Sequence, residues 1–527
     1  MTRGRGGAVA VGAGIFLSRI AGLVRERVIA RYLGLSAAAG AFRAALRIPN
    51  LLQNLLGEGV LSASFIPVYA RRLAEGRTED ASRVARAVGT LLLLVASLIA
   101  VIGMLAARPL VDLIVPGFTA ETHDLTVRIV RILFPGVALL VMSAWCLGVL
   151  NSHRRFFLSY VSPVLWNTAI IATAVVAGRR MAGSDADIGI WLGYGAVIGS
   201  AAQFLVQLPT VISLLHSVRP SLAIRDEGVQ TTLHAFVPVL LGRGSVQLSA
   251  FIDQVLASYL GPSVVAAMSN AQTLYLLPVS LFGMAVSAAE LPEMASATGD
   301  ATARAEHLQA RLAPALRRVV FLVVPSAIAF IAIGGPIIAL LFQTGRFTAD
   351  DTRVVWICLA GSALGLSAGT QGRLLGSAFY ALGDPRPPLH AALVRVAITG
   401  VTGYIAALPL RAALGYDAAW GGFGLTASAG FAAWVEFLLL KRWLDQRIGK
   451  VAIPTRLGLG AAAVAIVAGV AAYFTAALVQ SHVHRHSLAA IAAIGVFGAL
   501  YLSIMTVANV PEAAAFTHRF LRRRRAS

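Results

Sequence analysis

Arginine side chains stand within residues 18–72, in sequence that is otherwise apolar enough to lie in a bilayer. A charge in the middle of a membrane is costly even on lenient scales, so such residues normally face a water-filled cavity or an opposite charge. At 3.6 residues per turn, the first helix of this stretch has one polar face. That face consists of Ser18, Gly22 and Arg25, with Arg19 and Glu26 beside them.

The next helix carries a second polar stripe. It consists of Arg43, Arg47, Asn50 and Asn54, with Glu58 at its margin. Two neighbouring helices thus each offer a cationic seam, which predicts a positively charged cavity that receives an anion. Arg27 and Arg31 lie opposite the Ser18 face and near a helix end, where arginines reach back to the membrane surface.

Composition places these helices in a membrane. The chain has 527 residues, of which 57% are hydrophobic and 13% charged, and its mean hydropathy is +0.77. These values indicate a polytopic helical membrane protein. The formal net charge of +20 gathers in short loops between apolar spans, so we expect no nucleic-acid partner. No catalytic constellation and no Walker A motif is present, which predicts a protein that is not an enzyme and has no cofactor or ATP site.

Roughly 14 apolar segments are long enough to cross a bilayer, which takes about 20 residues. They lie at 8–33, 36–70, 86–115, 124–150, 156–178, 187–216, 230–260, 263–296, 312–343, 351–382, 388–410, 417–441, 456–480 and 487–509. Lys and Arg concentrate in every second loop, so the positive-inside rule places both termini in the cytoplasm. The basic tail that ends in Arg522–Arg525 is predicted to contact anionic membrane lipids or to anchor the topology.

An internal repeat relates two parts of the chain. VIARYLGLSAAAGAF at 28–42 matches VLASYLGPSVVAAM at 255–268 with a constant offset of 227. Six spans separate the copies, so both insert in the same sense. This predicts an all-α integral membrane fold with two parallel six-helix lobes around a central cavity, plus two C-terminal helices. The repeat also pairs Glu26 with Asp253.

The predicted organisation follows from this repeat. It comprises an N-terminal lobe at 1–226, a C-terminal lobe at 227–450, two additional membrane helices at 451–510 and a basic cytoplasmic tail at 511–527. Because acids inside spans are rare, Glu26, Glu58 and Asp253 are the candidate coupling or gating residues. Arg243 lies near Asp253 in the same span and is either a cavity residue or part of a structural ion pair.

Several stretches resemble one known family. They are SRIAGLVRERVIARYLG, IPNLL and GEGVLSASFIPVYA in the opening, GVLNSHRRFFLSYVSPVLWN at 148–167, LLPVSLFGMAVSAAELPEMA at 276–295, LFQTGRFTADDT at 341–352 and AFYALGDPRPPL at 378–389. Together they resemble the lipid II flippase family MurJ, also called MviN, of the multidrug/oligosaccharidyl-lipid/polysaccharide exporter superfamily. The likeness covers nearly the whole chain, in the same order.

The resemblance implies a multi-pass flippase of the bacterial cytoplasmic (inner) membrane. Such a protein moves the undecaprenyl-diphosphate-linked peptidoglycan precursor to the outer leaflet by alternating access, alongside the cell-wall synthesis machinery. The resemblance also implies a cavity whose arginines bind the diphosphate, and a groove for the lipid tail formed by the last two spans. The family's first-helix arginines match Arg19 and Arg25, and its polar neighbours match Ser18, Glu26, Asn50 and Glu58.

The chain departs from the family pattern at three positions. An acid that is usual in the second helix is Gly40 here, and two usual arginines are Gln53 and Thr273. The candidate replacement cations are Arg43, Arg47 and Arg243. A sodium site implied by the family would use Asp253 with Thr399, while a further partner falls at Gly403, which leaves at most one carboxylate.

The sequence thus predicts a lipid II flippase in which arginines hold the diphosphate. Its energy would come from the membrane potential or from a gradient of Na⁺ or H⁺. The missing arginines leave open a flippase for another polyprenyl-diphosphate-linked glycan, such as an O-antigen or exopolysaccharide unit. A non-transporting membrane scaffold for cell-wall synthesis is the alternative from another class. Loss of Arg19 and Arg25 would be silent in a scaffold and disabling in a transporter.

Overall fold

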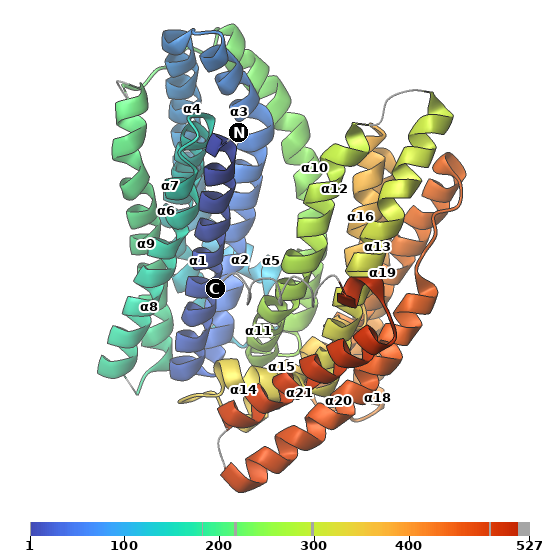
Figure 1. The fold of residues 1–527 in the computed structure, drawn as a ribbon. Coiled ribbons are helices and arrows are strands. Elements are labelled where there is room, and N and C mark those ends of the chain that lie inside the picture. The colour runs from blue at the N-terminus through green and yellow to red at the C-terminus, as the bar shows by residue number, and fades with distance from the viewer. Residues whose placement is uncertain (1, 182, 216–218, 297–299, 484–485, 515–527) are drawn as a thin grey trace. The chain divides into compact units, whose positions relative to one another are not determined.

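Apolar stretches fold into long helices throughout the computed structural model of the chain (Figure 1). The structure describes residues 2–181, 183–215, 219–296, 300–483 and 486–514, and within these ranges its regular elements are all helices. A bilayer core offers no water to backbone groups, and a helix satisfies them within its own segment. The predicted all-α membrane fold is confirmed.

The predicted number of spans agrees with these helices. Within the described chain, 11 helices are long and apolar enough to cross a membrane, and one pair bent by 44°, Ala349–Ala363 with Leu366–Ala381, raises the count to 12. The helices Thr2–Leu33 and Glu227–Ser258, each of 32 residues, correspond to the other two predicted spans. The first of these carries five ionisable residues between positions 19 and 31, so it is no ordinary apolar span.

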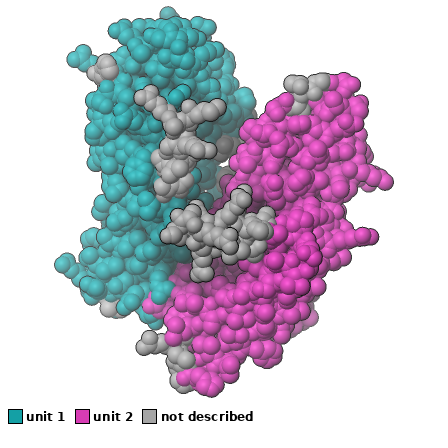
Figure 2. All heavy atoms as spheres, in the orientation of Figure 1, with its two compact units in different colours: residues 1–266, 345–347 teal, residues 267–344, 348–527 magenta. Residues whose placement is uncertain are grey.

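The chain divides into two compact units (Figure 2). The first holds Met1–Ala266 and Gly345–Phe347, and the second holds Ala267–Thr344 and Thr348–Ser527. The lobe boundary placed after residue 226 rests on the sequence repeat and stays a prediction, as do the other domain limits.

The first unit is organised around one buried helix. Its elements are α1 (Thr2–Leu33), α2 (Ala37–Leu56), α3 (Glu58–Ala74), α4 (Thr78–Leu105), α5 (Ala107–Ile114), α6 (Ala120–Ser152), α7 (Phe156–Val161), α8 (Pro163–Arg180), α9 (Asp185–Leu215) and α10 (Glu227–Ser258). Helix α6 packs against α2, α3, α4 and α9. In its most apolar stretch 78% of the residues are buried, more than in any other candidate span of the described chain. The indole N–H of Trp145 donates to the carbonyl oxygen of Ala85 at 3.0 Å and ties α6 to α4.

A short, separate segment completes the first unit and accounts for part of the GRFTADDT motif. The backbone N–H of Arg346 donates to the carbonyl oxygen of Arg31 at 2.8 Å, and its guanidinium pairs with Asp185. Gly345 has a φ of 60°, and a Cβ there would lie 2.4 Å from the same carbonyl oxygen of Arg31. Both facts require glycine at this position.

The second unit is organised around α19. Its elements are most of α11 (Pro262–Pro278), then η1 (Val279–Met284), α12 (Ala285–Ala295), α13 (Ala301–Ala332), α14 (Gly334–Phe342), α15 (Ala349–Ala363), α16 (Leu366–Ala381), α17 (Arg386–Ile405), η2 (Ala406–Leu410), α18 (Arg411–Ala413), α19 (Ala418–Ile448), α20 (Thr455–Val483) and α21 (His486–Val507). Helix α19 packs against α15, α16 and α17. Leu374, Phe379, Phe437 and Leu444 are among the residues of the core between α16 and α19.

The last two spans pack with small residues inward. Helix α20 packs against α13 and α21, and the residues it buries there are Ala461, Ala465, Ala468, Ala472 and Ala476. The side chains more than half exposed on α20 include Ile466, Val467, Tyr473 and Phe474. Membrane helices associate through small residues and direct large apolar ones to lipid, so this pattern indicates a lipid-facing helix. The hydroxyl of Tyr501 donates to the carbonyl oxygen of Phe321 at 2.7 Å and fixes α21 on α13.

Breaks within spans occur where proline or glycine permits them. The π-helical turn η1 follows Pro278, and η2 contains Pro409. Proline lacks the N–H that continues an α-helix, which accounts for both irregular turns. The 44° bend between α15 and α16 contains Gly365, where a Cβ would lie 2.3 Å from the Cα of Gly430 on α19. The bent pair and α19 therefore approach as closely as two backbones allow.

We predict that Gly365→Ala destabilises the protein, because the added methyl group meets backbone that cannot rotate away. The expected loss in the free energy of unfolding is about 1–3 kcal/mol. Gly376→Ala is the matched control on α16, because a Cβ there meets no atom within 4 Å. Thermal unfolding of both variants in detergent tests this prediction. Equal midpoints for the two variants would contradict it.

Candidate functional site

A carboxylate held between two arginines lies within the first unit. Oε1 of Glu26 accepts from Nη2 of Arg25 at 2.6 Å and from Nε at 3.1 Å, while Oε2 pairs with Nη2 of Arg43 at 2.7 Å. Glu26 is 5% exposed and Arg43 is 8% exposed. Arg25 and Glu26 come from α1 and Arg43 from α2, so this triad joins the two predicted polar seams. It carries one net positive charge.

Helix α8 holds the same arginine from another side. Nη1 of Arg25 donates to Oδ1 of Asn167 at 3.0 Å, and its guanidinium lies 4.8 Å from the ring centroid of Trp166. Nδ2 of Asn167 donates in turn to the carbonyl oxygen of Pro163 at 3.0 Å, which fixes the orientation of the amide. The Arg25 guanidinium is therefore positioned by a carboxylate, an amide and a ring face before any ligand arrives.

Arg47 forms a second cationic group on α2, about one turn beyond Arg43. Its Nε donates to Oε1 of Gln254 on α10 at 3.3 Å, and neighbouring Asp253 interacts with it electrostatically. Gln254 is only 4% exposed. The structure thus brings the predicted residues Arg47 and Asp253 together, and it adds Gln254, which sequence reasoning missed.

Other predicted site residues lie outside these groups. Arg19 and Asn50 are exposed and Ser18 is partly buried. Arg19 forms no hydrogen bond or ion pair with any residue that the structure describes. The side chains of Glu58 and Arg243 lie outside the described residues, so their assigned roles stay predictions.

Comparisons with known proteins identify the family. The family model "Lipid II flippase MurJ" matches residues 29–494. The chain belongs to the lipid II flippase MurJ family. It is 32% identical over 438 residues to the lipid II flippase MurJ of Burkholderia cenocepacia, which covers 82% of each chain. A probable lipid II flippase MurJ of Rhizobium tropici is 32% identical over 399 residues and covers 74% of this chain and 73% of that protein.

Solved structures agree on the fold. A lipid II flippase MurJ in an inward closed conformation superposes with a TM-score of 0.77 at 20% identity and covers 97% of this chain and 99% of that one. A MATE family multidrug resistance transporter of the MOP superfamily, in an inward-facing conformation, gives a TM-score of 0.66 at 20% identity. That comparison covers 82% of this chain and 94% of the transporter. These likenesses show that the chain has the fold of these two transporters.

The departure from the MurJ pattern at Gly40 has a physical reason. A Cβ on Gly40 would lie 2.4 Å from the carbonyl oxygen and 2.7 Å from the carbonyl carbon of Pro262, at the start of α11. An acid at this position would require α2 and α11 to separate. Of the two other departures, Gln53 is partly buried, and the Thr273 hydroxyl donates to the carbonyl oxygen of Ser269 at 3.1 Å within its own helix.

The predicted sodium ligands fall in different units. Asp253 lies on α10 of the first unit, and Thr399 lies on α17 of the second. Thr399 is 1% exposed, and its hydroxyl has no hydrogen-bond partner among the described residues. Neither fact tests the site, which stays a prediction.

A polar group inside the second unit was missed by sequence reasoning. Nη1 of Arg395 on α17 pairs with Oε2 of Glu436 on α19 at 3.0 Å. The pair interacts electrostatically with the phenol of Tyr275, as does Arg373 on α16. The sequence could have indicated this group, because it places charged residues within apolar spans and ionisable residues inside membrane helices are rare.

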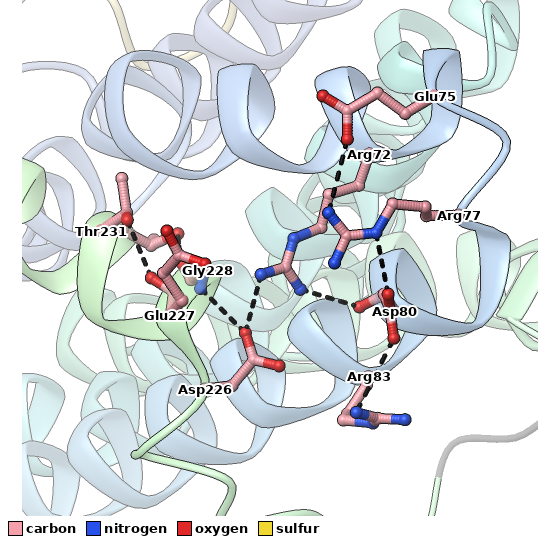
Figure 3. Close-up of polar contacts among 10 residues, drawn as sticks. Arg72, Glu75, Arg77, Asp80, Arg83, Asp226, Glu227, Gly228 and Thr231 are labelled. Atoms are coloured by element: carbon pink, nitrogen blue, oxygen red, sulfur yellow. Dashed lines mark hydrogen bonds and ion pairs between the residues drawn. The ribbon is translucent and has the colours of Figure 1, made fainter.

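A third polar cluster secures the start of α10 (Figure 3). Nη2 of Arg72 pairs with Oδ1 of Asp226 at 3.0 Å, and this carboxylate also accepts the backbone N–H of Gly228 at 2.8 Å as the N-cap of α10. Arg72 also lies 3.4 Å from the carbonyl oxygen of Asp80, whose side chain accepts from Nε of Arg77 at 2.9 Å. The cluster therefore fixes the helix that carries Asp253 and Gln254 to the end of α3 and the start of α4.

We predict that Glu26→Gln destabilises the chain strongly. The change leaves the buried guanidinium of Arg43 and the partly buried one of Arg25 without their shared carboxylate, and breaking a buried ion pair costs about 3–5 kcal/mol. Thermal unfolding in detergent measures this effect. The control is Glu75→Gln, which removes an exposed partner of Arg71 and Arg77 and should cost less than about 1 kcal/mol.

The double variant Glu26→Gln/Arg43→Met should recover part of the lost stability, because it also removes one of the unpaired charges. A Glu26→Gln protein as stable as the Glu75→Gln control would contradict the prediction.

We predict that the Arg72–Asp226 contact loses its effect in acid. Burial alone would raise the pKa of Asp226, but hydrogen bonds from Arg72 and from the N–H of Gly228 outweigh it and lower that pKa below its usual range. A lowered folded-state pKa stabilises the protein above the unfolded-state pKa of about 3.9, and this stabilisation disappears as the pH falls through the folded-state value.

Asp226→Asn keeps a capping side chain and removes the charge. Its unfolding midpoint should lie below that of the wild type at pH 7, and the difference should shrink as the pH falls toward 3. A difference that does not change with pH would contradict the predicted linkage.

Proposed function

We propose that the chain is a lipid II flippase. It carries undecaprenyl-diphosphate-linked disaccharide-peptide from the inner to the outer leaflet of the bacterial cytoplasmic membrane by alternating access. The observation that carries this proposal is the group of arginines Arg25, Arg43 and Arg47, which are held in place on the first two membrane helices of a MurJ family member.

The arginines suit a diphosphate for chemical reasons. Guanidinium groups remain charged at any physiological pH and present paired N–H donors that match phosphate oxygens. Glu26 occupies both Arg25 and Arg43 in the structure. In the proposal the diphosphate competes with Glu26 for these donors, so Glu26 serves as the counter-ion when no substrate is bound. Asn167 and Trp166 keep Arg25 in place during the exchange.

The remaining predicted residues have defined roles in this proposal. Arg19, which is exposed and pairs with no described residue, contacts the head group together with Ser18 and Asn50. Arg243 adds a further cation, and Glu58 acts with Asp253 in gating.

The transport step draws on the membrane potential or an ion gradient. A diphosphate carries negative charge outward, and an inside-negative potential favours this by about 2.3 kcal/mol per charge per 100 mV. Asp253 beside Arg47 is the acid that would respond to a coupling ion, Na⁺ or H⁺. The partnerless buried hydroxyl of Thr399 is consistent with an ion ligand.

The proposed orientation places both termini in the cytoplasm, because the loops rich in Lys and Arg then lie inside. The lipid tail of the substrate follows α20 and α21, whose exposed faces are apolar. The proposal also includes an association of the chain with proteins of the cell-wall synthesis machinery.

One alternative substrate follows from a specific observation. Gln53 and Thr273 lack the charge that the family pattern places at these positions. A flippase for another polyprenyl-diphosphate-linked glycan would share the diphosphate site and differ in the head group that it accepts.

We predict that the chain replaces a depleted lipid II flippase in a bacterial host, and that Arg25→Gln and Arg47→Gln lose this rescue because each removes a cation that contacts the diphosphate. Precursor in the outer leaflet and colony survival are the measurements. Arg27→Gln is the matched control, because Arg27 is an exposed arginine on α1 only two residues from Arg25. Membrane levels of each variant are compared by immunoblot.

Rescue by all four proteins would show that transport needs neither Arg25 nor Arg47 and would contradict the proposed diphosphate site. Failure of the wild type at normal membrane levels would favour a different polyprenyl-linked glycan or a non-transporting scaffold.

A further inference from the structure

A shallow recess lies at the end of α19 in the second unit. It has a volume of about 480 Å³ and is lined by Leu438, Lys441, Arg442, Asp445, Gln446 and Lys450. None of these residues belongs to the arginine groups of the first unit. We propose that this recess binds the phosphate of an anionic glycerophospholipid of the surrounding membrane.

The recess has an excess of positive charge. Lys441 pairs with Asp445, whose other oxygen accepts the backbone N–H of Val451 at 2.9 Å. The only carboxylate of the lining is therefore already occupied. Arg442 and Lys450 are exposed and form no ion pair or hydrogen bond with any described residue. Two uncompensated cations remain for a phosphate, which a guanidinium and an ammonium both bind well.

The loop that carries Lys450 is anchored. The side-chain amide of Gln309 donates to the carbonyl oxygen of Ile448, and Gly449, with a φ of 80°, ends α19 as its C-cap. Val451 is 4% exposed. These contacts place Lys450 beside the last turns of the helix. The bond to Ile448 also satisfies one of the carbonyl groups at the C-terminal end of α19.

An apolar path leads from the recess along the same helix. Phe431, Trp434 and Leu438 are 57%, 40% and 57% exposed, and their spacing of three and four residues places them on one face of α19 with Lys441 and Arg442. A spanning helix with exposed large apolar side chains faces acyl chains. The indole N–H of Trp434 already donates to the carbonyl oxygen of Leu364 at 2.9 Å, so the ring presents its apolar surface outward.

The cations of the recess and the apolar face of α19 together distinguish a phospholipid from a soluble phosphate. A soluble phosphate would use only the cations, whereas a membrane phospholipid would use the cations for its phosphate and the apolar face for an acyl chain. Basic clusters at the ends of membrane helices attract anionic lipids electrostatically. The site does not depend on which substrate the protein transports.

Native mass spectrometry of the delipidated full chain tests the proposal, with dioleoyl-phosphatidylglycerol as the probe and dioleoyl-phosphatidylcholine for comparison. We expect Arg442→Gln/Lys450→Gln to bind the first phosphatidylglycerol about tenfold more weakly or worse, with phosphatidylcholine binding unchanged. Arg456→Gln is the matched control, because it removes an exposed cation six residues beyond Lys450 that does not line the recess. Its phosphatidylglycerol affinity should equal that of the wild type.

Three outcomes would overturn the proposal. They are equal phosphatidylglycerol affinity in the double variant and the wild type, an equal loss in Arg456→Gln, and displacement of the lipid by millimolar inorganic phosphate. A second measurement covers the case in which the double variant does not fold. Photo-crosslinking of the wild-type chain with a phosphatidylglycerol that carries a diazirine acyl chain should label peptides within 431–450, and absence of that label would also contradict the proposal.

Discussion

The free-energy cost of placing a charge in a bilayer explains the side-chain contacts at the centre of the first unit. An isolated arginine at mid-membrane is costly, and a buried carboxylate is costly in the same way. Glu26 lies between Arg25 and Arg43, and these two ion pairs offset the cost for the arginines and for the carboxylate together. The contacts of α8 with Arg25 and of α10 with Arg47 extend this arrangement to other helices. These arginines therefore link α1 to α2 by an ion pair, and α1 to α8 and α2 to α10 by hydrogen bonds.

This arrangement also fits the proposed chemistry. In the proposal a doubly charged diphosphate replaces Glu26 as the partner of both arginines, and the released carboxylate must then be hydrated or protonated. Arg47 lies about one turn farther along α2 and is held by an amide whose replacement by phosphate oxygens gains a charge-assisted hydrogen bond. The cluster of Arg72 and Asp226 holds the start of α10, and thus Asp253 and Gln254, in a defined place.

Much of this could be predicted from the sequence because it depends on local patterns. Helical periodicity placed Arg25 and Arg43 on polar seams, hydropathy gave the spans, and the opening motifs gave the family. The partners could not be predicted in the same way. Asn167 lies 142 residues from Arg25 along the chain, and Gln254 lies 207 residues from Arg47. The reason for a glycine at position 40 could not be predicted either, because it depends on the packing of α2 against Pro262.

Direct binding of the lipid substrate tests the central claim most directly. The measurement is the affinity of the purified chain for lipid II, compared with that of Arg25→Gln, Arg47→Gln and the Arg27→Gln control, with undecaprenyl diphosphate as competitor. The account predicts that the first two variants bind at least about tenfold more weakly, that the control binds normally, and that undecaprenyl diphosphate competes in the wild type. Equal affinity in all four proteins, or no competition by the bare diphosphate lipid, would contradict a diphosphate site built from these arginines.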